Sequence, residues 1–334
     1  ISCATKMSSG WSGLHVLGVG QFDDAMLREL FSVALRMKQM VANKGKVDLL
    51  RGKVLANVFY EPSTRTMCSF DAAMKRLGGD VVSVNESSSS AKKGEVVEDT
   101  IRCLQCYCDV LVLRHPEKGT AARAAAVASK PIINAGDGVG EHPTQALLDL
   151  FTIADTRSSS SGSLSSGVIG MGGLTLTLVG DLKHGRTVHS LSLLASQLQP
   201  PPRIAMAAPE ALRMPEAVRT ELEQRGVQIE ECEDLTKLLP HTDVLYVTRV
   251  QRERFSSAAE YEAVAGSYVV DKKLMEGAPK EMVVLHPLPR VDEISHEVDS
   301  DPRAKYFEQM ENGMYVRMAL LALVLGADVS LLDE

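Results

Sequence analysis

Residues 54–79 read VLANVFYEPSTRTMCSFDAAMKRLGG, and this stretch decides the fold class. Its opening apolar run, at residues 54–59, is typical of a short buried strand. Pro62 suits the first turn of a helix, and apolar residues then recur at spacings of three and four until Gly78 and Gly79 end the pattern. A strand that leads through a turn into a helix is the repeating unit of a parallel sheet with crossover helices.

The same alternation continues along the rest of the chain, where short apolar runs alternate with longer stretches of helical period. We therefore expect an α/β protein made of two doubly wound parallel-sheet domains. Helices are expected at 23–41, 144–154 and 304–326. The expected strands lie at 54–59, 81–84, 110–113, 131–133, 174–179, 204–207, 244–247, 269–271 and 282–285.

The length of 334 residues fits about two domains. We expect a first domain at 1–150 and a second at 151–304. A C-terminal helix at 305–334 is expected to pack back on the first domain. Residues 158–173 are almost entirely Ser and Gly, so a flexible surface insertion is expected there.

Charge and hydropathy exclude two classes of partner. The chain has 36 basic and 43 acidic side chains, for a formal charge of −7, whereas nucleic-acid binders usually carry a basic patch and a high pI. The longest apolar run, at 318–326, is far shorter than the roughly 18 residues of a membrane span. The N-terminus shows no secretory signal and no initiator Met, so we expect the chain to be cut from a longer one.

The 6 cysteines are too few and too unevenly spaced for a disulfide framework, which points to a reducing, cytoplasmic setting. Cys103, Cys106 and Cys108 form a tight cluster that could suggest zinc. No second Cys/His pair follows at ligand spacing, and an apolar strand begins at once. We therefore expect buried structural thiols and no metal.

The residues directly after the expected strands are rich in arginine and histidine. Ligands of open α/β sheets bind beyond the carboxyl ends of the strands, so these residues should gather at one edge of each sheet. In an acidic protein, such a concentration of cations implies an anionic ligand. The segments are YEPSTRT (60–66), RHP (114–116), HPTQ (142–145), GDLKHGR (180–186), TR (248–249) and HPLPR (286–290).

Residues 63–66 indicate the chemistry of the ligand most specifically, because they lie on an expected helix N-terminus. Free N–H groups, hydroxyls and the helix dipole favour a phosphate there, and Arg65 can add a bidentate contact. The alternative to a phosphate site is an ordinary Ser/Thr N-cap that binds no ligand. The presence of Arg114 and His142 at the same edge disfavours this alternative. Taken alone, a His beside a Pro is more often structural, but an imidazole at this place can donate to a developing oxyanion.

Together these motifs resemble the aspartate carbamoyltransferase family, in order from about residue 14 to residue 326. The matching segments are STRT (63–66), RHP (114–116), HPTQ (142–145), GDL with GRTVHS (180–182 and 185–190), TRVQ (248–251) and HPLPR (286–290). The missing initiator Met resembles the form found as one domain of the large multifunctional pyrimidine-synthesis protein of animals and fungi. The serine-rich residues 158–167 depart from the bacterial pattern.

The resemblance implies transfer of a carbamoyl group from carbamoyl phosphate to the α-amino group of L-aspartate, in de novo pyrimidine biosynthesis. It implies carbamoyl phosphate contacts from Ser63, Thr64, Arg65, Thr66, Ser89, Arg114, His142, Gln145 and the backbone carbonyls of Leu288 and Pro289. The implied aspartate contacts are Lys93, Arg186, Arg249 and Gln251. The implied catalytic residues are Arg65, Thr66, Lys93, Arg114 and His142.

The polar loop at 87–95 would by default be a solvated basic loop. In the family, residues that correspond to Ser89 and Lys93 enter the neighbouring subunit's site, which implies a homotrimer with shared sites. No metal or cofactor is implied, because guanidinium groups can offset the repulsion between two anionic substrates. No protein general base emerges, and the departing phosphate could accept the amine proton.

Ornithine carbamoyltransferase is the nearest rival, since it shares the phosphate motif and the fold. It is expected to carry a Cys in the His-x-Leu-Pro turn and a Ser-Met-Gly segment, whereas this chain has HPLP and TRVQ. Arg249 suits a second carboxylate and would repel an ornithine ammonium group. An inactive scaffold is disfavoured because every expected chemical position is filled, and a dehydrogenase lacks its glycine fingerprint. Glu61 is expected to pair with an arginine of the second domain, such as Arg186 or Arg254.

Overall fold

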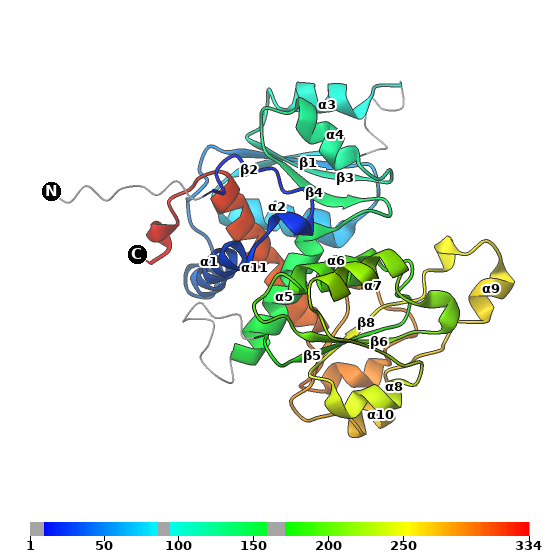
Figure 1. Cartoon of the computed structure of the whole chain (residues 1–334). Coiled ribbons are helices and arrows are strands. Elements are labelled where there is room, and N and C mark those ends of the chain that lie inside the picture. The colour runs from blue at the N-terminus through cyan, green and yellow to red at the C-terminus, as the bar shows by residue number, and fades with distance from the viewer. Residues whose placement is uncertain (1–9, 86–93, 159–170, 334) are drawn as a thin grey trace. The chain divides into compact units, whose positions relative to one another are not determined.

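The computed structural model describes residues 10–85, 94–158 and 171–333 (Figure 1). The chain divides into two compact units. Unit 1 comprises Ile1–Gln21, Glu29–Thr144 and Gly313–Glu334, and unit 2 comprises Phe22–Arg28 and Gln145–Asn312. Three helices therefore contribute residues to both units: α1 (Asp24–Lys44), α5 (Pro143–Ser158) and α11 (Tyr306–Val324).

Unit 1 is built on a parallel sheet with the strand order β2-β1-β3-β4. Its strands are β1 (Val54–Phe59), β2 (Asp80–Asn85), β3 (Val110–His115) and β4 (Ile132–Asp137). Helix α2 (Thr64–Arg76) covers one face of this sheet, and α3 (Val97–Leu104) and α4 (Thr120–Val127) cover the other (Figure 1). The strand order reverses direction between β1 and β3, and ligands of open α/β sheets bind at such a switch point.

Unit 2 is built on a second parallel sheet, with the order β7-β6-β5-β8-β9 and a switch point between β5 and β8. Its strands are β5 (Thr175–Val179), β6 (Arg203–Ala207), β7 (Ile229–Glu231), β8 (Val244–Val247) and β9 (Val283–Leu285). Its other α-helices are α6 (Arg186–Ala195), α7 (Glu216–Gln224), α8 (Leu235–Leu238), α9 (Ala258–Glu262) and α10 (Lys272–Glu276). The α/β class with two parallel-sheet domains is confirmed.

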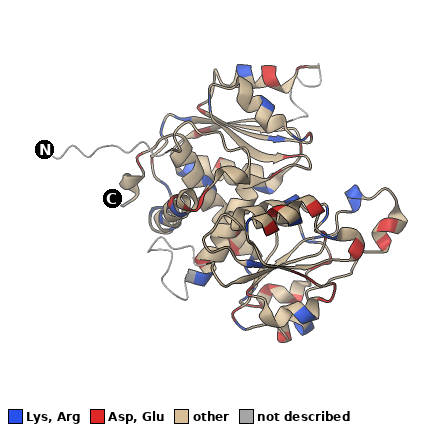
Figure 2. Cartoon of the chain, in the orientation of Figure 1, with Lys and Arg blue, Asp and Glu red and all other residues tan. Residues whose placement is uncertain are grey.

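Short 3₁₀ helices connect several of these elements. They lie at Val19–Gln21, Glu210–Leu212, Leu239–His241, Arg252–Arg254, His296–Ser300 and Val329–Asp333. Acidic and basic residues lie near one another on surface helices (Figure 2), as on α7, where Arg219 pairs with Glu216 and Glu223. Within the described ranges, no helix combines the length and apolarity that crossing a bilayer requires.

Two expectations about local structure are wrong. The segment 269–271 is not a strand: Val270 forms an isolated bridge to Ile294, because its backbone hydrogen bonds go to Glu293 and Ser295, which lie outside the strands of the sheet. Cys108 is buried, and burial raises the pKa of its thiol to about 11. Cys103 and Cys106, however, are exposed, because they lie on α3 and the turn after it, before the buried strand begins.

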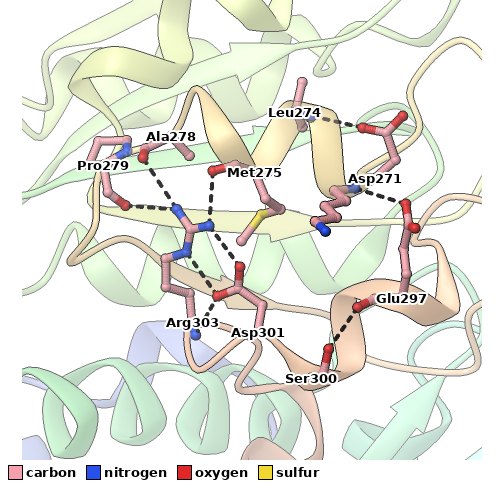
Figure 3. Close-up of polar contacts among 10 residues, drawn as sticks. Asp271, Leu274, Met275, Ala278, Pro279, Glu297, Ser300, Asp301 and Arg303 are labelled. Carbon is pink, nitrogen blue, oxygen red and sulfur yellow. Dashed lines mark hydrogen bonds and ion pairs between the residues drawn. The ribbon is translucent and has the colours of Figure 1, made fainter.

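A guanidinium group closes the C-terminal end of α10 (Figure 3). Arg303 donates to the backbone carbonyls of Met275, Ala278 and Pro279 at 2.9–3.2 Å. It also forms a bidentate pair with Asp301, with N–O distances of 2.9 and 2.7 Å. Arg303 thus adds a donor to the Met275 carbonyl in the last turn of α10 and to two carbonyls just after the helix, which ties this end of α10 to the chain that leads from β9 to α11.

Candidate active site

In unit 1, the candidate binding residues begin at the N-terminus of α2, directly after β1. Ser63 is the N-cap residue, but its side chain makes no capping hydrogen bond, so its hydroxyl is not used to close the helix. Thr64 and Arg65 are exposed in the first turn, and Thr66 is buried. The backbone N–H groups of this turn point out of the helix and form a ready site for an anion. The geometry favours anion binding over the ordinary Ser/Thr cap.

Arg114, at the end of β3, lies beside this turn and is only 7% exposed. Its Nη1 atom donates to the carbonyl of Ala135 at 3.1 Å, and its Nη2 atom lies 3.2 Å from the Glu61 carboxylate. Burial lowers the pKa of Arg114, while the Glu61 charge opposes this shift. Its buried Nε atom has no hydrogen-bond partner among the described residues, which leaves a donor for a ligand.

Arg65 and Arg114 approach each other closely enough to interact. Burial lowers the pKa of Arg65, and the positive charge of Arg114 lowers it further. Two guanidinium groups that repel each other are stabilised when an anion lies between them. The structure therefore brings together the Arg65 and Arg114 that the sequence assigned to one phosphate.

His142 is 4% exposed, immediately before the start of α5. The turn that leads to it is held by Asn134, whose Nδ2 atom donates to the carbonyls of Leu17 and Glu141 at 2.9 and 3.5 Å. The Glu141 carboxylate accepts from the backbone N–H of Val19 at 2.6 Å. These contacts place the imidazole at the carboxyl end of the unit 1 sheet with little freedom to move.

The turn after β9 carries Leu288 and Pro289. The backbone N–H of Leu288 donates to Nδ1 of His286 at 2.8 Å, so the ring proton lies on Nε2 and is donated to Glu293 at 2.7 Å. Burial lowers the pKa of His286, although Glu293 opposes the shift. Leu288 has φ +52°, a left-handed conformation that is uncommon for Leu and is typical of binding sites held by their surroundings.

Unit 2 has a cavity of about 420 Å³ at the carboxyl ends of β5 and β8. Arg249 and Thr248 contribute to its lining, whereas Arg186 and Gln251 do not. Gly180 has φ +110°, and a Cβ atom there would lie 2.2 Å from the carbonyl oxygen of Thr248. Only glycine therefore allows the ends of the two strands to approach this closely.

Asp181 connects the two loops that carry the predicted aspartate contacts. It is completely buried, and its carboxylate accepts from the backbone N–H groups of His184 at 2.9 Å and Gln251 at 3.4 Å. Arg186 begins α6 at the end of the first of these loops, and Arg249 lies in the second. A buried carboxylate thus holds the loops on which the cationic side chains stand.

Two of the predicted site residues, Ser89 and Lys93, lie outside the described residues. Glu61 pairs with Arg114 of its own unit, a contact that the sequence analysis did not anticipate. The sequence motifs assigned no role to Asp149, Asp181, Tyr246 and Gln309. One signal was available for Asp149: it is a lone charge in an apolar helical run, four positions after Gln145.

Models of a known family match both units of the chain. Residues 14–155 match the carbamoyl-phosphate-binding domain of aspartate/ornithine carbamoyltransferases, and residues 172–324 match their Asp/Orn-binding domain. The chain belongs to the aspartate/ornithine carbamoyltransferase family. The resemblance inferred from the motifs is therefore confirmed.

The chain is similar both to long multifunctional proteins and to proteins of about its own length. The multifunctional protein pyr1-3 of Dictyostelium discoideum is 54% identical over 95% of this chain, and the multifunctional protein CAD of Squalus acanthias is 52% identical over 94%. The chain spans only 14% and 13% of the length of these two proteins. The aspartate carbamoyltransferase catalytic subunit of Methanopyrus kandleri is 48% identical, over 95% of this chain and 99% of its own length.

Solved structures show the same fold. Aspartate transcarbamoylase from Trypanosoma cruzi, in complex with carbamoyl aspartate and phosphate, aligns with a TM-score of 0.86 and 42% identity, covering 94% of this chain and 97% of that chain. The catalytic subunit of M. jannaschii aspartate transcarbamoylase aligns with a TM-score of 0.83 and 43% identity, covering 93% and 98%.

Proposed function

We propose that this chain transfers the carbamoyl group of carbamoyl phosphate to the α-amino group of L-aspartate, giving N-carbamoyl-L-aspartate and phosphate. The observation that carries the proposal is the pair of neighbouring guanidinium groups, Arg65 and Arg114, at the free N-terminus of α2. That arrangement suits a phosphate. Solved relatives bind carbamoyl phosphate and aspartate, as the T. cruzi enzyme does.

In this proposal, residues of unit 1 bind the phosphate and polarise the carbonyl. Ser63, Thr64 and Arg65 hold the phosphate oxygens with the N–H groups of α2. Thr66, Arg114 and His142 donate toward the carbonyl oxygen, which becomes negative as the amine attacks. The carbon–oxygen bond to phosphate then breaks, and the departing phosphate accepts the amine proton. Most of the acceleration comes from positioning and oxyanion stabilisation.

Unit 2 supplies the contacts that select the amino acid. Arg186, Arg249 and Gln251 bind the two carboxylates of aspartate in this proposal. The carbonyls of Leu288 and Pro289, with Gln145, bind the carbamoyl amide. Arg249 in the cavity beyond β8 favours a second carboxylate over the ammonium group of ornithine.

The assembly forms the second part of the proposal. We propose a cytoplasmic homotrimer in which Ser89 and Lys93 of one subunit complete the site of its neighbour, with carbamoyl phosphate contacts from Ser89 and aspartate contacts from Lys93. The similarity to multifunctional proteins supports a covalent link to other domains of pyrimidine synthesis.

One assay tests the reaction: product formation from carbamoyl phosphate with aspartate and, separately, with ornithine. We expect turnover with aspartate and none above background with ornithine. Turnover with ornithine but not with aspartate would contradict the assignment of Arg249 and the proposed substrate.

The Arg249→Ala variant tests the division of roles between the units. Loss of a charge-assisted contact to a carboxylate should raise the KM for aspartate by at least about tenfold. Binding of carbamoyl phosphate in the absence of aspartate, measured by calorimetry, should stay within about twofold of wild type. A comparable loss in both measurements would show that Arg249 does not act on aspartate alone.

A further inference from the structure

The buried side of α5 carries an aspartate that lies outside every substrate-binding motif. Asp149 is 0% exposed, and the apolar neighbours Leu147, Leu150 and Phe151 are buried with it. A carboxylate in such surroundings costs free energy unless hydrogen bonds compensate for the lost water. Its partners therefore indicate what the charge is retained for.

Side chains from three different elements, Gln145, Tyr246 and Gln309, are among the donors to Asp149. Its Oδ1 atom accepts from Nε2 of Gln145 at 2.8 Å and from Nε2 of Gln309 at 2.6 Å. Its Oδ2 atom accepts from the hydroxyl of Tyr246 at 2.7 Å. Burial and the Asp149 charge raise the pKa of Tyr246 well above its ordinary value, so the phenol stays protonated and donates. Amide nitrogens can only donate, so Oδ1 carries no proton.

This arrangement fixes the orientation of the Gln145 amide. A glutamine side chain has one donating and one accepting end, and either can face a given neighbour. The acceptor Oδ1 of Asp149 holds the donating end inward. The Oε1 atom of Gln145 is the end that remains, on the side of the amide that does not bond to Asp149. Gln145 therefore offers an acceptor to a ligand.

The same carboxylate also reaches the turn after β9. Gln309, which donates to Asp149, accepts with its Oε1 atom from the backbone N–H of His286 at 2.9 Å. His286 in turn accepts from the N–H of Leu288. Asp149 is thus hydrogen-bonded to Gln145 and connected to the turn that carries the Leu288 and Pro289 carbonyls. The Oε1 atom of Gln145 and the carbonyl oxygens of Leu288 and Pro289 are acceptors, so each can pair only with a donor such as an N–H on the substrate.

We propose that Asp149 is a positioning residue that sets specificity for a carbamoyl group: it orients the Gln145 amide so that Oε1 accepts from the carbamoyl NH₂. This inference rests on the proposed function. An acyl group without an N–H leaves the Oε1 acceptor unpaired, and sites built around a hydrogen bond reject analogues that lack it.

Acetyl phosphate tests the inference, because it carries a methyl group in place of the carbamoyl NH₂. With aspartate as nucleophile, both donors react in the same way: the new bond joins the aspartate nitrogen to the carbonyl carbon, the carbon–oxygen bond to phosphate breaks, and phosphate takes the amine proton. We define the selectivity as kcat/KM with carbamoyl phosphate divided by kcat/KM with acetyl phosphate.

The Asp149→Asn variant keeps the size of the side chain but offers Gln145 a donor as well as an acceptor. The Gln145 amide can then flip, which exchanges the positions of its oxygen and nitrogen atoms. The selectivity should therefore fall by at least about tenfold. Tyr246→Phe is the matched control, because it removes a donor to Oδ2 and leaves both contacts to Oδ1; its selectivity should stay within about twofold of wild type. If Asp149 only supports the fold, the two kcat/KM values fall together and the selectivity is unchanged, which would overturn the inference.

Gln145→Ala separates this inference from the proposed function. If it lowers the selectivity while a folded Asp149→Asn protein retains it, Asp149 does not orient Gln145 and the inference fails alone. If Gln145→Ala leaves the selectivity unchanged, the proposed contact of Gln145 with the carbamoyl group is wrong as well. Should Asp149→Asn not fold, neutron diffraction from deuterated wild-type crystals with carbamoyl phosphate decides: Oε1 toward the carbamoyl amide supports the inference, and a deuterated nitrogen there contradicts it.

Discussion

At the residue scale, the candidate site combines side chains at the strand ends with buried carboxylates. Arg65, Arg114 and His142 lie near the ends of β1, β3 and β4, where the local sequence alone indicates the charge offered to a ligand; their contacts with substrate stay predictions. The contacts of Asp149 and Asp181 could not be predicted, since they depend on which distant residues these carboxylates meet. Tyr246, for example, lies 97 positions from Asp149 along the chain. Buried polar networks depend on which distant residues pack together, and the spacing of residues along the sequence does not show this.

His286 gives a pH-dependence that belongs to the residue scale. Burial lowers its pKa below the ordinary 6.5, so the folded protein resists a proton that the unfolded chain takes up. Its contribution to stability is complete above pH 6.5 and is lost as the pH falls from there through the folded-state pKa. Between pH 8 and 5.5, His286→Gln should therefore show a shallower fall in the free energy of unfolding than wild type, by up to about 1.4 kcal/mol per pH unit.

Urea unfolding at each pH measures this difference in slope, and the lower overall stability expected of the variant does not affect the comparison. His241→Gln is the control, because His241 is exposed and should leave the slope unchanged. Equal slopes for His286→Gln and wild type would show that His286 takes up its proton equally in both states.

Elements with a strong apolar pattern were predicted well, and weak ones were not. The strands expected at 54–59 and 244–247 match β1 and β8, because both are buried and the apolar residues delimit them. Strand β7 was missed, since its sequence IEE contains a single apolar residue and pairs with only one neighbour, β6. Edge strands depend on a partner more than on their own side chains.

The connection between α10 and the β9–α11 segment gives a prediction at this scale. Arg303→Ala removes a donor from three carbonyls and removes the partner of Asp301, whose pKa the Arg303 contact holds below its ordinary value. We expect a loss of about 2 kcal/mol in the free energy of unfolding, because the part-buried Ala278 carbonyl loses its donor and the bidentate contact to the Asp301 carboxylate is lost. Hydrogen exchange of the α10 amides should also become faster, and urea unfolding measures the global effect.

Arg213→Ala is the matched control for Arg303. Its ion pair with Glu233 has a similar N–O distance, 3.0 Å, but the two side chains are 51% and 56% exposed. Exposed pairs contribute little, so we expect a change below about 1 kcal/mol. Equal losses in the two variants would indicate that the carbonyl contacts of Arg303 do not stabilise α10.

At the scale of the whole molecule, the two units divide the predicted chemistry between them. The phosphate residues 63–66, Arg114 and His142 belong to unit 1, whereas Gln145, Arg249 and the Leu288 turn belong to unit 2. The sequence could predict two sheets of this kind because each carries its own series of strands and helices. Subunit assembly leaves no comparable periodic pattern in the sequence. The proposed trimer rests on the family resemblance at Ser89 and Lys93, so it needs a test of its own.

Complementation between subunits provides that test. If Lys93 serves a neighbour's site, Arg65→Ala and Lys93→Ala homotrimers should each be nearly inactive, because every site lacks one contact. In mixed trimers, a Lys93→Ala subunit supplies an intact Arg65 and an adjacent Arg65→Ala subunit supplies an intact Lys93. Random exchange in a one-to-one mixture completes about a quarter of the sites, so activity should recover to about a quarter of wild type.

Activity is measured before and after exchange, with mass spectrometry to verify that mixed trimers have formed. A mixture of wild type and the Arg65→Ala, Lys93→Ala double mutant is the control. By the same counting, it retains about a quarter of its sites when they are shared and about half when each subunit is self-sufficient. Complete exchange without recovery in the single-mutant mixture, together with half activity in the control, would place Lys93 in its own subunit's site, because only self-contained sites give both results.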